Sequence, residues 1–364
     1  MARLEELCTK ASSNIAQKDL DNHNGCYPIY GASGFIKNVD FYTQEKPYVA
    51  IVKDGAGVGR VMILPAKSSV IGTMQYILPN DNVNVEYLAY ALESMNLSKY
   101  YTGATIPHIY FKDYCKEVLP NHSLLEQINI AEQLNKVDTI ISLRKQQLAK
   151  LDELVKSRFI EMFGDPVINP QGWKIAPLSR LIVTANNGMA RRGKDEDGSI
   201  VLRLVELQNG FIDYSKPNRI KLTEAEKKRY RLIENDFLFA RVNGNPDYVG
   251  RCAVFNEIGE PVYHNDHIIR VHFDDSRING CFTSVLLNSE YGKRQLKEQI
   301  KTSAGQYTIS QDGIGAIITI IPPLSLQTEF ATFVEQTDKS KFEIQKSLNQ
   351  LETLKKALMQ KYFG

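Results

Sequence analysis

A glycine-rich stretch in the first third of the chain, Asp54-Gly55-Ala56-Gly57-Val58-Gly59, has the composition of a loop that cradles a phosphate or S-adenosylmethionine. Such loops follow a strand and open a helix, because the helix N-terminus supplies the N–H groups that hold the anion. Here the next residues, Val61-Met62-Ile63-Leu64, are typical of a second strand. We therefore interpret the stretch as a hairpin turn and not as a cofactor loop.

Two Asn-Pro pairs, Asn169-Pro170 and Asn245-Pro246, are reminiscent of a DNA methyltransferase. Neither is followed by the aromatic residue that would stack a flipped base. Pro246-Asp247 suggests a nuclease, but no Glu-x-Lys follows at a strand's length. The sequence also contains no Ser/His/Asp set with supporting context, and we expect no catalytic residue in this chain.

His264 and His267, with Asp266 between them, could ligate a metal ion. Metal sites in proteins need further ligands at suitable spacing, and no third ligand follows here. A histidine satisfied within a strand is the better interpretation, and we expect no metal site.

Composition sets the remaining bounds. The 364 residues are enough for two or three domains, and the hydrophobic and charged fractions of 43% and 24% are those of a globular protein. The five cysteines are scattered without a CxxC pair, which favours reduced thiols in a cytoplasm, and no secretory signal or membrane span is expected. The net charge is +2 in total. It is −1 over residues 1–117 (11 basic, 12 acidic) and +3 over 167–320 (21 basic, 18 acidic), so any nucleic-acid surface must arise from charge placement.

One helical segment occurs twice in the sequence as an internal repeat. With an offset of 200, residues 130–164 fall on 330–364, and eight positions are identical: Ala131/Ala331, Asp138/Asp338, Leu148/Leu348, Leu151/Leu351, Leu154/Leu354, Lys156/Lys356, Phe163/Phe363 and Gly164/Gly364. Each copy follows a short apolar strand and a proline, and each closes at Phe-Gly, a common helix stop. The repeat predicts two equivalent long helices in one chain.

Both helices carry a heptad-like seam. The first runs Leu134, Val137, Ile141, Arg144, Leu148, Leu151, Val155, Arg158, Met162, and the second runs Val334, Thr337, Lys341, Ile344, Leu348, Leu351, Lys355, Leu358, Tyr362. This spacing favours an antiparallel two-helix coiled coil. The alternative is two independent amphipathic helices, each packed on its own domain.

The segments between the helices resemble each other in design. Both read as mixed α/β with many short strands, and Val58-Gly59-Arg60-Val61 aligns with Val249-Gly250-Arg251-Cys252 after a similar turn. The fold class we expect is α+β: two mixed α/β domains separated by two long antiparallel helices that form a coiled coil, in a pseudo-two-fold circular arrangement.

The whole chain resembles a known family, the specificity (S) subunits of type I restriction–modification systems. The resemblance rests on the order of several stretches rather than on one motif: YPIYGASGFIKNVDFY (27–42), VAIVKDGAGVGRV (49–61), VLPNHSLLEQINIAEQLNKVD (118–138), KLDELVKSRFIEMFGDP (150–166), GWKIAPLSRL (172–181), NDFLFARVNGNPDYVGR (235–251) and IIPPLSLQTEFATFVEQTD (320–338).

The resemblance implies a target recognition domain at residues 1–117, a conserved spacer helix at 118–166, a second target recognition domain at 167–320 and a second spacer helix at 321–364. It implies a DNA-binding subunit without catalysis of its own, which reads a bipartite, asymmetric double-stranded DNA target with one half-site per domain. The implied partners are modification (M) subunits, two of them, and restriction (R) subunits held through the complex. S-adenosylmethionine, ATP and Mg²⁺ are expected in those partners and no cofactor in this chain.

Residue type suggests which side chains contact DNA, since Arg, Lys, Asn and Gln read base edges and phosphates take Lys, Arg, Ser, Thr and Tyr. We expect the candidates at loop tips. In the first domain they are Tyr30, Ser33, Lys37, Asn38, Lys53, Arg60, Thr73, Gln75, Thr105, His108 and Tyr110; in the second they are Arg191, Arg192, Lys194, Arg241, Asn243, Asn245, Tyr248, Arg251, Asn265, His267, Gln306 and Tyr307. A solvated surface position is the alternative for each of them.

Two other functions stay open at this stage. One is an orphan DNA methyltransferase or nuclease component, which the missing motifs disfavour. The other is a non-catalytic coiled-coil scaffold with two adhesive domains. It would bind DNA without the steep salt dependence that phosphate contacts impose, or not at all even with M subunits present.

The helices also predict a spacing. A helix of about 35 residues is roughly 50 Å long, which corresponds to about 15 base pairs of DNA. Deleting one heptad from one helix should therefore shorten the nonspecific gap between the half-sites or abolish binding, as methylation mapping of the variant would show. An unchanged gap in a variant that still binds would contradict this ruler.

Overall fold

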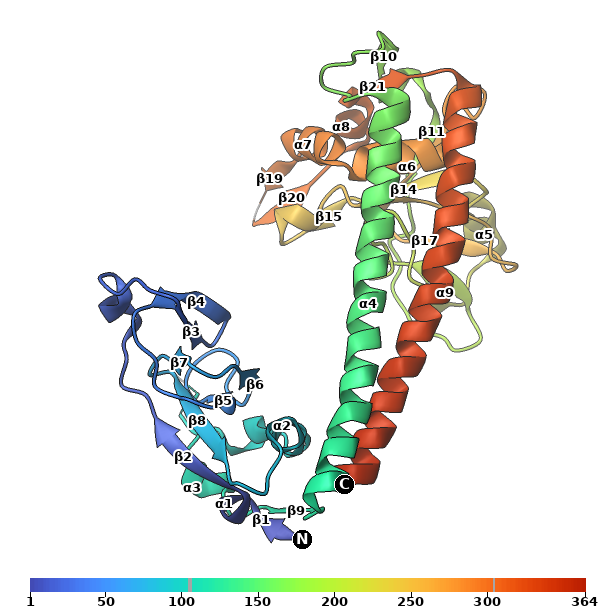
Figure 1. Cartoon of the computed structure of the whole chain (residues 1–364). Helices are drawn as coiled ribbons and strands as arrows, with labels where there is room; N and C mark the ends of the chain where they lie inside the picture. Colours follow the sequence, from blue (N-terminus) through green and yellow to red (C-terminus); the bar gives the residue numbers. More distant parts are fainter. Residues whose placement is uncertain (104–106, 304) are drawn as a thin grey trace. The chain divides into compact units, whose positions relative to one another are not determined.

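The computed structural model describes residues 1–103, 107–303 and 305–364 (Figure 1). The chain divides into two compact units, one of residues 1–147 with 344–364 and one of residues 148–343. Each unit therefore contains one α/β domain and a segment of each long helix. None of the helices in the described ranges combines the length and hydropathy that a bilayer span requires.

The first unit is built on small, mostly antiparallel sheets with short helices. Its strands are β1 (Ala2–Arg3), β2 (Cys8–Ser12), β3 (Tyr27–Gly31), β4 (Gly34–Val39), β5 (Tyr48–Val52), β6 (Val61–Leu64), β7 (Ser69–Val70), β8 (Met74–Pro79) and β9 (Val118–Leu119). Its short helices are α1 (Leu4–Leu7), η1 (Gln17–Leu20), α2 (Val85–Ser94), η2 (Leu97–Tyr100) and α3 (Phe111–Tyr114). The sheets have the orders β2-β8-β5-β6, β4-β3-β7 and β1-β9.

The second unit is also built from short strands in small sheets and short helices. Its strands are β10 (Lys174–Pro177), β11 (Ile182–Asn187), β12 (Ser199–Leu202), β13 (Arg219–Ile220), β14 (Asp236–Ala240), β15 (Val242–Asn243), β16 (Cys252–Val254), β17 (Val262–His264), β18 (Ile268–Phe273), β19 (Lys301–Ser303), β20 (Gln306–Thr308) and β21 (Ile318–Ile321). Its short helices are η3 (Leu178–Arg180), α5 (Glu224–Tyr230), η4 (Pro246–Tyr248), α6 (Gly280–Asn288), α7 (Glu290–Glu298) and α8 (Gln311–Ala316). The sheets have the orders β11-β18-β14-β16, β13-β12-β17, β10-β21 and β15-β20-β19.

The two domains share one topology in three sheets, and the second domain adds the small sheet β15-β20-β19. The sheet β2-β8-β5-β6 corresponds to β11-β18-β14-β16, and in both the central pair has the same register, with Val52 opposite Met74 and Ala240 opposite Ile268. The sheet β4-β3-β7 corresponds to β13-β12-β17, and each contains one parallel pair, β3 with β7 and β12 with β17. The prediction of two α/β domains of related design is confirmed, and the register allows positions to be compared residue by residue.

The central strands β5 and β14 are buried along their whole length. Val49 and Ile51 pack on the side of α2, whereas Tyr48, Ala50 and Val52 pack on the opposite face of the sheet. In β14 the same alternation separates Phe237 and Phe239 from Leu238 and Ala240. A strand covered on both faces reads as a continuous apolar run, which explains why these stretches lack a polar alternation.

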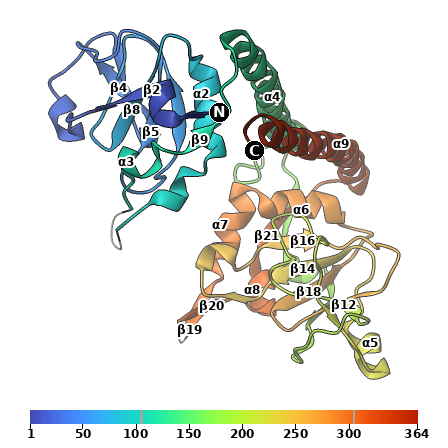
Figure 2. The same ribbon diagram turned by 90° about the horizontal axis from the view of Figure 1, so that it is seen from below.

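Two 40-residue helices, α4 (Leu124–Phe163) and α9 (Leu324–Phe363), run side by side in both views (Figures 1 and 2). A capping box opens α4, since Ser123 and Glu126 bond each other's backbone and side chains. Gly164 ends α4 with a φ of +76°, a left-handed conformation that suits glycine. The predicted glycine stop is therefore confirmed for this helix.

Within each unit the helix segments pair in antiparallel fashion. In the first unit Lys355 Nζ lies 2.8 Å from Asp138 Oδ1, and in the second Lys341 Nζ lies 2.7 Å from Asp152 Oδ1. Every residue of the two predicted seams is buried or half-buried, while most of their neighbours are exposed. The coiled-coil prediction is confirmed, and the alternative of two independent helices is wrong because the seams face each other.

A buried glutamine near the start of each helix ties the helix to its domain. Gln127 Oε1 accepts from the N–H of Asn84 (2.9 Å), and its Nε2 donates to the carbonyls of Asn82 and His122. Gln327 repeats this pattern with the N–H of Asn279 (2.8 Å) and two further carbonyls. Asn84 and Asn279 are the N-caps of α2 and α6, so each glutamine joins a long helix to the equivalent short helix of its domain.

Replacing either glutamine by an isosteric apolar residue should destabilise its unit. Gln327→Leu leaves one buried N–H and two carbonyls without a partner, and we expect the free energy of unfolding to fall by about 3 kcal/mol. Gln336→Leu, an exposed position on the same helix, is the matched control and should change it by less than about 0.5 kcal/mol. Urea denaturation followed by circular dichroism measures both. Equal free energies of unfolding for the two variants would show that the hydrogen bonds of the glutamine do not stabilise the unit.

Candidate nucleic-acid interface

The glycine-rich stretch after β5 is a hairpin, as predicted. Gly59 N–H donates to the carbonyl of Val52 (2.8 Å), and the chain continues into strand β6. Gly59 has a φ of +86°, and a Cβ there would lie 2.9 Å from the backbone nitrogen of Ser98. Only glycine fits this approach, so the hairpin is held against η2 and its tip is fixed in position.

Three segments of the first unit meet at this end of the sheet. Lys53 N–H donates to the carbonyl of Thr73 (3.0 Å), and Lys53 O accepts from Ile109 N–H (3.0 Å). His108 Nδ1 is hydrogen-bonded to Asp54 Oδ1, and the His108 ring centroid lies 4.1 Å from that of Tyr110. The predicted candidates Lys53, Thr73, His108 and Tyr110 are therefore brought together by backbone bonds.

The hairpin between β3 and β4 joins this group. Arg60 Nη1 donates to the carbonyl of Ala32 (2.9 Å), next to Ser33, which is exposed in the turn. We call Ser33, Lys53, Asp54, Arg60, Thr73, His108 and Tyr110 the first loop cluster.

The remaining candidates of the first unit lie elsewhere. Lys37 Nζ donates to Leu20 O (3.0 Å) and Asn24 Oδ1 (3.1 Å), with the exposed Asn38 beside it on β4, and Tyr30 is half-buried against Phe35. Thr105 lies outside the described residues.

The predicted loop-tip position of Gln75 is wrong. Its side chain is 1% exposed in the middle of the sheet, where it donates to the hydroxyl of Tyr114. The residue belongs to strand β8, and strand register turns it into the core instead of toward solvent.

The second unit brings its candidates together in the equivalent place. Arg241 N–H donates to His267 O (2.7 Å) and Arg241 O accepts from Ile309 N–H (2.9 Å), the same pattern that Lys53 makes with Thr73 and Ile109. Arg192 Nη1 lies 2.7 Å from Asp266 Oδ1, and its Nη2 lies 3.1 Å from His267 Nε2. Arg241 Nη1 donates to Asp266 O (3.0 Å), so Asp266 links the two arginines. We call Arg192, Arg241, Asp266 and His267 the second loop cluster.

A small sheet extends from this cluster. Asn243 on β15 lies opposite Tyr307 on β20, and Gln306 is exposed beside them. Asn245 caps η4 by accepting from Asp247 N–H (3.0 Å). The guanidinium of Arg251 stacks 3.9 Å from the ring centroid of Tyr248, and Arg251 occupies the position equivalent to Arg60, after the positive-φ Gly250.

Some predicted side chains already have protein partners. Arg191 makes two bonds to Glu226 in α5, and this lowers the pKa of that carboxyl to about 2. Lys194 is exposed, whereas Asn265 is buried at the end of β17. Arg191 is thus held on α5, away from the bonds of the second loop cluster, and Asn265 serves the turn that carries His267.

Sequence reasoning missed two residues of these clusters. Asp54 was considered only as part of a cofactor loop and Asp266 only as a metal ligand. His264 is fully buried, with Nδ1 3.2 Å from Tyr230 O, and its burial lowers its pKa to about 4. Within the part of the chain that the structure describes, no group of three His, Cys, Asp or Glu residues could hold a metal ion.

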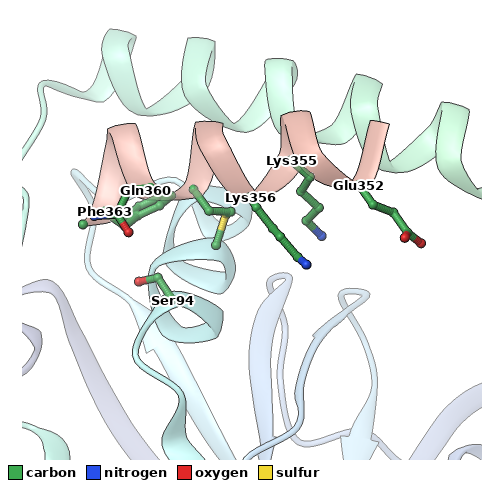
Figure 3. Close-up of a pocket in the computed structure, with 8 residues that line it drawn as sticks. Ser94, Glu352, Lys355, Lys356, Gln360 and Phe363 are labelled. Atoms are coloured by element: carbon green, nitrogen blue, oxygen red, sulfur yellow. The ribbon is translucent and has the colours of Figure 1, made fainter. Parts of the chain in front are cut away.

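The first unit also contains an open groove of about 490 Å³ between the end of α2 and the last turns of α9 (Figure 3). Lys355 and Lys356 line it together with Ser94, Gln360 and Phe363. Lys355 is already paired with Asp138, and its Nζ lies 3.9 Å from Glu93. The groove is separate from the first loop cluster in the residues that line it, and it shows no convergent set of polar groups.

The sequence is similar to those of two type I restriction enzyme specificity subunits. The chain is 27% identical over 321 residues to the StySPI specificity subunit of Salmonella potsdam, covering 82% of this chain and 69% of that protein. It is 22% identical over 285 residues to the EcoKI specificity subunit of Escherichia coli K12, covering 73% of this chain and 61% of that protein.

Solved structures agree on the fold. The S subunit of a type I restriction–modification system from M. genitalium aligns with a TM-score of 0.66 at 16% identity, covering all of this chain and 95% of that one. A chain from a study of assembly and conformational transition of the type I system aligns with a TM-score of 0.53 at 14% identity, covering 99% of this chain and 96% of that one. The family model of the type I restriction modification DNA specificity domain matches residues 1–153 and 196–353, most of the sequence, and the chain belongs to this family.

Proposed function

We propose that this chain is the sequence-reading subunit of a type I restriction–modification complex. It recognises a bipartite, asymmetric DNA target with one half-site per domain, and it holds methyltransferase and restriction subunits on that target in the cytoplasm. Methylation, ATP hydrolysis and cleavage belong to those partners, which bind S-adenosylmethionine, ATP and Mg²⁺.

The observation that carries the proposal is a shared scaffold with different side chains at equivalent positions. The same backbone bonds hold Lys53 and Arg241, and they place Thr73 where the second domain has His267. The segment that packs on them carries His108 in one domain and Thr308 in the other, since Ile109 and Ile309 make the same bond. Two domains that share one topology but differ in the polar side chains of their loop clusters suit two different half-sites.

The residue types in the two loop clusters support DNA as the ligand. Arginine and lysine contact phosphates and guanine edges, while asparagine and glutamine pair with adenine. Arg60 and Arg192 are exposed, and the guanidinium of Arg192 is positioned by its contacts with Asp266 and His267. Neither unit is strongly basic overall, so these fixed cations, not bulk charge, have to supply the phosphate contacts.

Methylation mapping tests the proposal first. We expect co-expression of this chain with its cognate methyltransferase subunit, in a host without other methylation, to yield modified adenines within a single split motif. The purified complex should have steeply salt-dependent affinity for that DNA, because phosphate contacts release counterions. An assembled complex that leaves the genome unmodified, or binds DNA independently of salt, would favour the scaffold; methyl transfer by the isolated chain would favour an orphan methyltransferase.

Substitutions in one loop cluster should affect one half-site. We expect Arg192→Ala to weaken binding to the target by about 10- to 100-fold, with recognition of the first domain's half-site retained, and Arg60→Ala to do the reverse. The controls remove an exposed lysine outside the clusters, Lys228→Ala in the second unit and Lys46→Ala in the first, and should change affinity less than about threefold. Fluorescence anisotropy with duplexes scrambled in either half measures this. Equal loss for both half-sites from one substitution would contradict the assignment of one half-site to each domain.

A further inference from the structure

Each loop cluster contains one aspartate that contacts basic side chains which could otherwise contact DNA. In the first unit Asp54 pairs with His108, and Lys53 Nζ lies 3.9 Å from its second oxygen. In the second unit Asp266 holds Arg192 at 2.7 Å through its carboxylate and Arg241 through its carbonyl. Both carboxylates are about one-quarter exposed, so they lie at the surface of their clusters.

The two aspartates are not a feature inherited from the shared scaffold. Lys53 and Arg241 occupy equivalent positions, so Asp54 corresponds to Val242 and not to Asp266. Asp266 in turn corresponds to Gly72, since Asp266 N–H bonds Met189 O as Gly72 N–H bonds Ile15 O. A carboxylate thus reaches the cations of each cluster from a different loop, which points to a requirement of the site itself.

A carboxylate in such a place opposes binding to any phosphate backbone. It repels phosphates, and it occupies donors that would otherwise neutralise them. Such repulsion discriminates between DNA sequences if the cation contacts a base edge in the complex with the cognate target and a phosphate in the complex with any other sequence. Asp266 forms an ion pair with Arg192, whose Nη1 also donates to Ala190 O (2.8 Å). These two contacts limit the directions open to the guanidinium, while its Nη2 can exchange His267 for a base acceptor.

We propose that Asp54 and Asp266 are the residues that reject non-cognate DNA, each for the half-site of its own domain. Each carboxylate holds its cations in the orientation needed for base contact and keeps them from settling on phosphates of a wrong sequence. The inference rests on the proposed function and adds to it the residues that set its selectivity.

The test uses the full-length chain assembled with its methyltransferase subunits and four duplexes: the mapped target, the target scrambled in the first half, in the second half, and in both. We expect Asp266→Asn to raise affinity for the duplex scrambled in the second half by about tenfold, so that the ratio of target affinity to scrambled-duplex affinity falls by at least about tenfold. The salt slope on that scrambled duplex should steepen by about one, because one more phosphate is neutralised. Asp54→Asn should do the same for the duplex scrambled in the first half.

Charge-matched controls separate this role from general electrostatics. Asp197→Asn and Asp81→Asn each remove one exposed carboxylate outside the loop clusters of the second and first unit. They should change affinity for all four duplexes equally and by less than about threefold. In the double variant Arg192→Ala/Asp266→Asn the gain on scrambled DNA should disappear, because the freed cation is absent.

The outcomes are distinguishable. A wild-type complex that prefers no split sequence overturns the proposed function and this inference together. A selective wild-type complex whose Asp54→Asn and Asp266→Asn variants keep the full preference overturns the inference alone. A variant that loses affinity for every duplex and melts earlier has a structural aspartate, and that result also overturns the inference; Asp→Ala variants at both positions repeat this check without the amide.

Discussion

The antiparallel pairing of α4 and α9 is the contact on which both domains depend. In the first unit the end of α9 supplies Phe363, whose ring centroid lies 5.1 Å from that of Tyr87 in α2. In the second unit the end of α4 supplies Phe163, 4.8 Å from Phe282 in α6. The first domain is therefore completed by the end of α9, which lies far away in sequence, and the second by the end of α4, which directly precedes it. A shift in helix register would disrupt these contacts.

The seam combines apolar packing with a few charged pairs that fix this register. Lys355 with Asp138 and Lys341 with Asp152 are partly buried, and each pair can form only at one alignment of the helices. Such pairs add little stability, since desolvation offsets much of their attraction. Their effect is to make other alignments worse, because a slipped helix would leave a lysine facing apolar side chains.

One backbone frame carries different side chains at equivalent positions in the two domains. Backbone bonds hold the cluster positions, so the side chains there can differ without loss of the fold. Lys53 and Arg241 illustrate this, because their peptide groups make the same bonds while their side chains meet different partners, Asp54 in one domain and the carbonyl of Asp266 in the other. Each cluster also places a carboxylate among its basic side chains, so neither surface is uniformly positive.

The sequence by itself determined the helices, their seam and the presence of two related domains, because periodicity and repetition are properties of local order along the chain. It also identified the cationic residues Arg60, Arg192 and Arg241, whose types suit DNA. Only the tertiary structure decided which of them meet. Gln75 looked like a loop residue but is turned inward by strand register, and Asp54 and Asp266 gained their partners from loops far away in sequence. Register and loop contacts are long-range, and no local pattern encodes them.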